Sequence, residues 1–121
     1  MQKQKRILVA DDEKALAKAL QLKLTHTGFE TLTASNGEEA LSLIKTGNFD
    51  LVLLDLVMPK MDGFQVLENV SKLAKRPKII VTSNLSQEED AEKAKSMGAI
   101  HFFVKSDTPI TEIVSYVQSV L

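Results

Sequence analysis

Five short, mostly apolar segments alternate along the chain with five longer segments of helical character. The apolar segments are residues 7–10, 30–34, 51–54, 78–82 and 100–104. Three of them are continuously apolar, which is typical of parallel strands whose two faces are both covered. The second alternates more between apolar and polar residues, and this pattern predicts a strand at the edge of the sheet.

Local signals mark the helices that follow the first two strands. The first helix runs from about residue 14 to 27, and Gly28 can supply the left-handed residue that ends it. The second helix begins at Asn36, where Glu39 three residues later predicts a capping box, and it ends at Gly47.

The third and fourth helices carry signals of the same kind. The fourth starts at Ser86, has Glu89 as its third residue, and stops at Gly98. The third follows Asp62 and Gly63, and the apolar residues at helical spacing along it are Val66, Val70 and Leu73.

A fifth helix completes the alternation of strand and helix. Thr108 is its predicted N-cap and Pro109 its first helical residue, followed by a buried stripe made of Ile110, Ile113, Val114, Val117 and Leu121. Such alternation implies a parallel sheet with right-handed crossovers and helices on both faces. We therefore expect one α/β domain over residues 1–121, a flavodoxin-like three-layer sandwich with a doubly wound sheet of order 2-1-3-4-5.

Composition narrows the classes of function. The chain has 121 residues, of which 44% are hydrophobic and 26% charged, and this balance is ordinary for a soluble globular domain. A net charge of −1 offers no field that would attract nucleic acid or an anionic membrane. There is no cysteine, no signal-peptide pattern and no apolar run long enough to span a bilayer. We expect a cytoplasmic protein.

Polar residues stand at the carboxyl ends of four predicted strands. Asp11 and Asp12 follow the first strand and Asp55 the third, while Thr82 ends the fourth and Lys105 follows the fifth. In open α/β sheets, ligands bind at this edge, near the point where strand order reverses. Each residue alone could be a turn residue, a helix cap or a solvated lysine. Their convergence in the order 2-1-3-4-5 favours a functional site.

The residue types in this cluster indicate a ligand and a reaction. Three neighbouring carboxylates repel one another unless a cation lies between them, and an oxygen-only set suits Mg2+. Lys105 can contact a phosphoryl oxygen through its charge, and the Thr82 hydroxyl can donate a hydrogen bond to another. The cluster therefore predicts a phosphoryl-acceptor site in which Asp55 is the nucleophile.

Several short motifs follow one another in a fixed order, and they cover almost the whole chain. They are Asp11-Asp12, Asp55, Met58-Pro59, Asp62-Gly63, Thr82-Ser83, Gly98-Ala99 and Lys105. Together they resemble the receiver domain of bacterial two-component response regulators, in particular the single-domain receivers of chemotaxis. The resemblance implies that Asp55 takes a phosphoryl group from a sensor histidine kinase or a histidine phosphotransfer protein.

The resemblance also implies a metal site and a switch. Asp12 and Asp55 would bind Mg2+ directly, together with the Val57 backbone carbonyl, and Asp11 would bind through water. The switch residues would be Thr82 and Phe102. The face made by the fourth helix, fifth strand and fifth helix would contact a downstream protein or a second copy. Such a domain is no enzyme beyond its own phosphorylation and slow dephosphorylation.

Two positions depart from the family pattern. Ser106 follows the site lysine where the family usually has a proline, commonly after a cis bond, which costs about 3–4 kcal/mol without proline. Phe102 stands where tyrosine is common, so the predicted switch residue lacks a hydroxyl.

The lifetime of the phosphoryl group depends on residues beside the site. Val57 and Asn84 should flank the path of a water that attacks the phosphorus, and Val57 has no group to orient that water. We therefore expect the phosphorylated form to be comparatively long-lived.

Three other classes of function share this fold. A flavodoxin-like electron carrier needs a phosphate loop where this chain has Asp11, Asp12 and Glu13, which would repel a flavin phosphate. A phosphatase with an aspartate nucleophile needs a second aspartate at Val57. A pseudo-receiver that only binds partners would not need the acidic residues together with Lys105.

Overall fold

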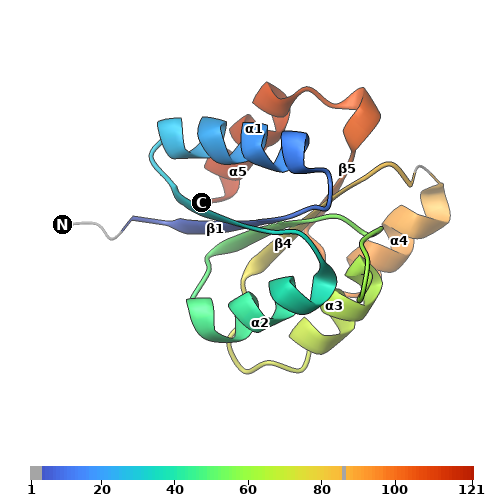
Figure 1. Cartoon of the computed structure of the whole chain (residues 1–121). Coiled ribbons are helices and arrows are strands. Elements are labelled where there is room, and N and C mark those ends of the chain that lie inside the picture. Colours follow the sequence, from blue (N-terminus) through green and yellow to red (C-terminus); the bar gives the residue numbers. More distant parts are fainter. Residues whose placement is uncertain (1–3, 86) are drawn as a thin grey trace.

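The computed structural model describes residues 4–85 and 87–121 and shows strand and helix in strict alternation (Figure 1). The strands are β1 (Arg6–Ala10), β2 (Glu30–Ala34), β3 (Leu51–Leu54), β4 (Lys78–Ser83) and β5 (His101–Val104). The helices are α1 (Lys14–His26), α2 (Gly37–Gly47), α3 (Gly63–Val70), α4 (Glu88–Ser96), the short 3-10 helix η1 (Lys105–Asp107) and α5 (Ile110–Val120). None of the helices in these two ranges is long and apolar enough to cross a membrane.

All five strands are parallel, in the order β2-β1-β3-β4-β5. This order confirms the predicted doubly wound sheet and the edge position of β2. The register places Ala10, Leu54 and Val81 side by side across the three central strands. The carboxyl ends of β1, β3 and β4 therefore reach the same edge of the sheet, where a short polar extension of each can meet the others.

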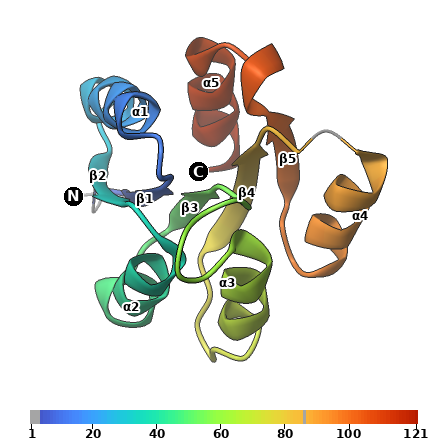
Figure 2. The same cartoon turned by 45° about the vertical axis from the view of Figure 1, so that its right-hand side comes forward.

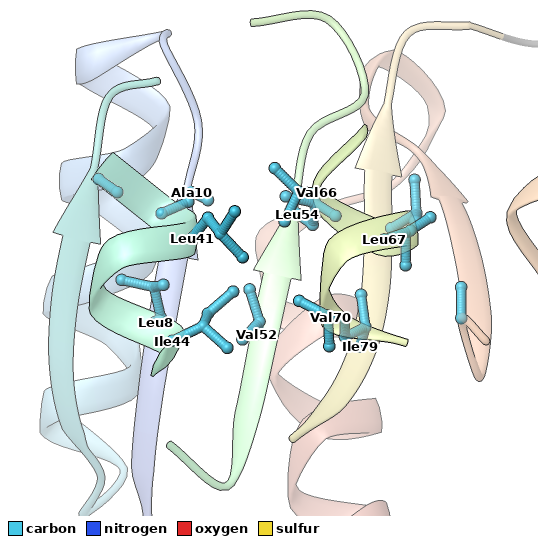
Figure 3. Packing of buried hydrophobic residues seen from close by; sticks show 14 of the residues in the cluster. Leu8, Ala10, Leu41, Ile44, Val52, Leu54, Val66, Leu67, Val70 and Ile79 are labelled. Atoms are coloured by element: carbon cyan, nitrogen blue, oxygen red, sulfur yellow. The ribbon is translucent and has the colours of Figure 1, made fainter. Parts of the chain in front are cut away.

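Helices cover both faces of the sheet. One layer consists of α1 and α5 and the other of α2, α3 and α4, as Figures 1 and 2 show from two directions. Alternate residues of each strand supply the two apolar cores, so that Leu8 faces the α2–α4 layer while Ile7 faces the α1–α5 layer. Figure 3 shows the first core, in which α2 and α3 side chains such as Leu41 and Val70 pack on Val52.

The ends of α1 and α2 largely follow the predicted chemistry. Gly28 has a φ of 109°, a conformation that suits glycine, and it ends α1 as expected. Asn36 caps α2 by accepting a hydrogen bond from the Glu39 amide at 2.9 Å. The Glu39 carboxylate accepts from the Ser35 amide at 2.8 Å instead of from Asn36, so the predicted capping box closes one residue early.

Three helix boundaries differ from the sequence prediction. Leu73 lies beyond α3, which ends at Val70, although it still packs against the core. Thr108 is not the cap of α5: its hydroxyl donates to the Val104 carbonyl at 2.8 Å, and Pro109 takes the N-cap position. The fourth helix begins at Glu88 with Gln87 as N-cap, and the predicted cap Ser86 lies outside the described residues.

Gly63 couples the start of α3 to the strand that carries Asp55. A Cβ at Gly63 would press on the Asp55 carbonyl and lie 2.6 Å from the Leu56 Cα, both of them backbone atoms that cannot turn aside. We expect Gly63→Ala to lower the free energy of unfolding by about 1–3 kcal/mol, measured by urea denaturation. Gly47→Ala is the matched control, because the atoms nearest to its Cβ belong to the Phe49 side chain and not to the backbone. Equal losses in both variants would contradict the argument.

Candidate functional site

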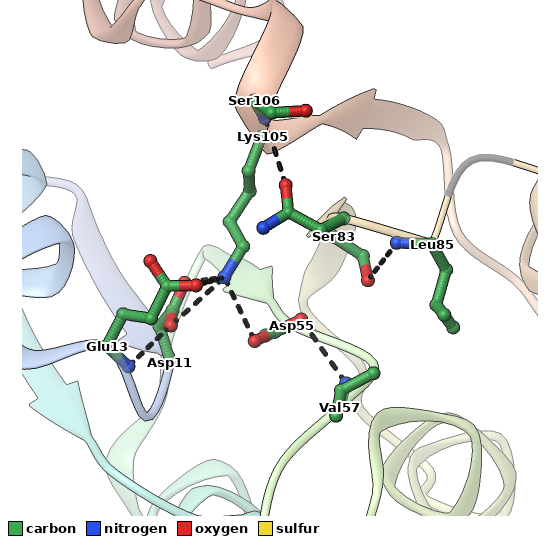
Figure 4. Close-up of polar contacts among 9 residues, drawn as sticks. Asp11, Glu13, Asp55, Val57, Ser83, Leu85, Lys105 and Ser106 are labelled. Carbon is green, nitrogen blue, oxygen red and sulfur yellow. Dashed lines mark hydrogen bonds and ion pairs between the residues drawn. The ribbon is translucent and has the colours of Figure 1, made fainter.

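The carboxyl ends of β1, β3 and β5 bring three charged side chains together (Figure 4). The backbone holds two of them: the Asp11 amide donates to the Ala34 carbonyl and the Asp55 amide to the Ala10 carbonyl, both at 2.9 Å. These bonds continue the sheet ladder by one residue beyond each strand. Asp11 and Asp55 are therefore as firmly placed as the strands themselves, and both are buried.

Lys105 connects the acidic residues. Its Nζ lies 3.0 Å from Asp11 Oδ2, 3.1 Å from Asp55 Oδ2 and 3.2 Å from Glu13 Oε1. The side chains of Lys105, Asp11 and Asp55 are no more than 5% exposed, whereas that of Glu13 is 54% exposed. Because a buried charge is costly unless paired, the Lys105 ammonium stabilises the two buried carboxylates.

The pKa values reflect this balance. Burial raises the pKa of Asp55, although the hydrogen bond from Lys105 opposes the shift. Burial likewise raises the pKa of Asp11, against hydrogen bonds from the Glu13 amide and Lys105. Burial alone would lower the pKa of Lys105, but the hydrogen bonds to Asp11 and Asp55 outweigh it and hold that pKa above its usual range. Lys105 therefore compensates the negative charge of the two carboxylates only in part, and a further cation beside them would be favourable.

The three aspartates fit a small divalent cation. Asp11, Asp12 and Asp55 each offer an oxygen, and these atoms lie within 4.8 Å of one another. Asp12 is exposed, so it gives the cluster a side open to solvent. Hard oxygen ligands that leave room for water match the preference of Mg2+. The predicted ligation by Asp12, Asp55, the Val57 carbonyl and, through water, Asp11 stays a prediction.

An open pocket of about 310 Å³ lies over Asp55. Its floor and walls are charged on the side of β1 and partly apolar on the side of β4. The lining residues are Asp12, Glu13, Asp55, Val57, Asn84, Leu85 and Lys105. The Val57 amide donates to Asp55 Oδ1 at 3.2 Å, while the Val57 side chain is 56% exposed beside the opening. A ligand of phosphoryl size can therefore reach Asp55 from solvent.

The two predicted switch residues lie on the neighbouring strands β4 and β5, as expected from the predicted strand order. Thr82 in β4 pairs in register with Phe103, and Val81 pairs with Phe102. Thr82 is buried. Phe102 is partly buried and packs against the core beneath α4, where Ala94 also lies. Their coupling stays a prediction.

Two contacts in the loops were not predicted from the sequence. Glu13 shares Lys105 with the aspartates, and only its position directly after Asp12 hinted at a role. The Ser106 amide donates to Asn84 Oδ1 at 3.0 Å, across 22 residues of sequence. The peptide bond between Lys105 and Ser106 is trans.

The chain matches one known protein family over most of its length. The model of the response regulator receiver domain aligns with residues 7–118. The chain belongs to this family. Receiver domains typically accept a phosphoryl group on an aspartate with Mg2+, and this receiver has the acidic pocket that such chemistry uses.

Relatives of this receiver support both the fold and the family. The probable transcriptional regulator ycf27 of Porphyridium aerugineum is 40% identical over 100% of this chain and 49% of its own length. TrrA of Thermotoga maritima, solved with Mg2+ and BeF, is 38% identical, with a TM-score of 0.83 over 97% of this chain and 99% of that chain. The CheX–CheY–BeF3–Mg2+ complex of Borrelia burgdorferi contains a chain 34% identical, with a TM-score of 0.87 over 96% and 88% of the two chains. The receiver spans about half the length of the curated relatives it matches.

Removal of the Lys105 charge should destabilise the metal-free protein in a pH-dependent way. Lys105→Met keeps most of the side-chain bulk but leaves Asp11 and Asp55 without their cation, at a cost of about 2–4 kcal/mol near neutral pH. Both carboxyl pKa values, already raised by burial, then rise further. A carboxyl group whose pKa is higher in the folded than in the unfolded protein takes up its proton in the folded protein first, and this stabilises the fold as the pH falls. The loss in free energy of unfolding caused by Lys105→Met should therefore shrink between about pH 7.5 and 5.

Urea unfolding in the presence of a chelator measures this effect at each pH. Lys18→Met, on the exposed surface of α1, is the matched control and should show a small change that does not depend on pH. A deficit of Lys105→Met that is constant or grows on acidification would contradict the proposed role of the buried carboxylates.

Proposed function

We propose that Asp55 is the phosphoryl acceptor of this receiver. The observation that carries the proposal is the contact of Lys105 Nζ with Asp11 and Asp55, two buried carboxylates at the ends of adjacent strands. Asp55 is the one of the two that also lines the open pocket. It is therefore the buried carboxylate that shares a pocket with Asp12, Val57 and Lys105, and a phosphoryl donor that enters this pocket would meet it.

The transfer itself requires little covalent chemistry from the protein. A carboxylate oxygen of Asp55 forms a bond to phosphorus, and the bond from phosphorus to the donor's histidine nitrogen breaks. The electron pair of that bond stays with the imidazole, which takes up a proton from solvent. Lys105, already 3.1 Å from Asp55 Oδ2, can turn its ammonium to an oxygen of the incoming phosphoryl group.

Mg2+ is the metal that these residues would hold. Asp12 and Asp55 would bind it directly with the Val57 carbonyl, and Asp11 through water. When bound, it neutralises charge on the transferring phosphoryl group. The support is the oxygen cluster within 4.8 Å.

The proposed switch involves α4, which lies beside β5. Ala94 is the one buried residue of α4, so few contacts hold this helix on the core. We infer that the Thr82 hydroxyl moves toward the phosphoryl group and that Phe102 then takes a more buried position. The surface of α4, β5 and α5 would change with it, where Tyr116 stacks on His101 at 4.4 Å between ring centroids.

The partners follow from this chemistry. The donor would be a sensor histidine kinase or a histidine phosphotransfer protein, which uses ATP-derived phosphate in the cytoplasm. The α4–β5–α5 surface would contact a downstream protein or a second copy. The whole of residues 1–121 would act as one receiver, without turnover of other substrates and without direct contact of its own with nucleic acid.

Labelling with acetyl phosphate tests the acceptor. Wild type should gain the mass of one phosphoryl group when Mg2+ is present and little when it is chelated. Asp55→Asn should gain none, because an amide is a poor nucleophile. Asp62→Asn, which preserves the α3 cap, should label as wild type does. Labelling of Asp55→Asn at the wild-type level would refute the assignment.

The switch can be separated from the acceptor. Thr82→Ala should accept the phosphoryl group, but its phosphorylation should not shift the amide resonances of α4 and α5. The variant lacks the hydroxyl that would bind the phosphoryl group. Thr33→Ala, on the opposite edge of the sheet, should show the wild-type shifts. Wild-type shifts in phosphorylated Thr82→Ala would exclude this coupling.

A further inference from the structure

A hydrogen bond joins the loops that follow β4 and β5 at the mouth of the pocket. The Ser106 amide, directly after Lys105, donates to Asn84 Oδ1 at 3.0 Å. Asn84 lies two residues after Thr82 and lines the same pocket as Asp55 and Val57. In Figure 4 the dashed line from Ser106 marks this bond above Asp55.

This bond determines which end of the Asn84 carboxamide is available. A backbone N–H can only donate, so the atom that faces Ser106 must be the carbonyl oxygen. Oxygen and nitrogen occupy the two arms of a planar fork. With Oδ1 bonded to the Ser106 amide, the Nδ2 amino group, which is a donor, is the arm left for the pocket.

A donor and an acceptor have opposite effects on hydrolysis. In hydrolysis, the water oxygen bonds to phosphorus, the bond from phosphorus to the Asp55 oxygen breaks with its electron pair returning to the carboxylate, and a water proton leaves to solvent. An acceptor can take a hydrogen bond from the attacking water and leave its lone pair directed at phosphorus. A donor instead occupies a lone pair of the water, or binds a phosphoryl oxygen.

We propose that the Ser106 backbone N–H is a positioning group that lengthens the life of the phosphorylated receiver by holding the Asn84 carbonyl away from the attacking water. The proposal rests on the proposed function of Asp55. Val57, the other side chain expected to flank the approach of the water, has no polar group and cannot supply the missing acceptor. Of these two flanking side chains, Asn84 is thus the one whose orientation can change the rate.

The residue type at position 106 makes this contact possible. A proline there would have no N–H to donate, and the Asn84 side chain would be free to rotate. An exposed hydrogen bond biases such a rotation only modestly, by roughly two- to ten-fold in population. The same factor bounds the expected change in hydrolysis rate.

A double-mutant cycle tests the proposal. Wild type, Ser106→Pro, Asn84→Ala and the double variant are labelled with acetyl phosphate and Mg2+, the donor is removed, and phosphoryl loss is followed by intact mass. Ser106→Pro should lose phosphate roughly two- to ten-fold faster than wild type. In the Asn84→Ala background the same substitution should change the rate less than two-fold. Proline also disturbs the Lys105 backbone, but that disturbance is present in both backgrounds and cancels in the cycle.

Two conservative variants complete the test without proline. Ser106→Ala keeps the N–H and should retain the slow loss of phosphate. Asn84→Asp keeps an oxygen for Ser106 and places a second oxygen, an acceptor, where Nδ2 was, so it should lose phosphate several-fold faster.

Different results would overturn the two proposals. Absence of phosphoryl label on wild-type Asp55 would overturn the proposed function. Normal labelling with equal effects of Ser106→Pro in both backgrounds, or with an unchanged or slower loss in Asn84→Asp, would overturn the role of Ser106 alone.

Discussion

The buried contact between Lys105 and the carboxylates of Asp11 and Asp55 is the interaction on which the site depends. Each partner alone would be an unpaired charge in a largely apolar setting, and together they satisfy one another. The contact is possible because parallel strands bring their carboxyl ends to one edge. The apolar sheet therefore holds the acidic residues in place, and Lys105 makes their burial tolerable.

The same arrangement suits the chemistry that we propose for the site. Four acidic side chains, Asp11, Asp12, Glu13 and Asp55, gather around a single ammonium, so negative charge exceeds positive charge. A divalent cation relieves that excess, and the pocket stays open to solvent on the side of Asp12. Within the family, this combination turns an ordinary carboxylate into a phosphoryl acceptor.

The layers of the fold differ in how firmly they are held. Both apolar cores are continuous with the central strands, yet α4 contributes little to its core beyond Ala94. In the proposed switch, a change at the carboxyl ends of β4 and β5 would reach α4, which few buried contacts hold, while β1 and β3 keep the aspartates in place. The Asn84–Ser106 bond lies between these parts, since it joins the loops that follow β4 and β5.

The sequence by itself determined the elements, their order and most of the site. Apolar periodicity identified the five strands, Gly28 and Asn36 marked helix ends, and the polar residues after the strands identified Asp11, Asp55 and Lys105. These signals are local, because the backbone preferences of glycine, asparagine and apolar runs act within a few residues. Alternation along the chain then left few topologies.

Only the tertiary structure decided how particular side chains are paired. Thr108 bonds to Val104 and does not cap α5, and Glu39 reaches Ser35. Lys105 and Asp11 stand 94 residues apart, and sequence separation carries no information on which oxygen the ammonium contacts. Orientation of long or forked side chains depends on groups that folding brings near them, and each such contact is worth too little to leave a pattern in the sequence.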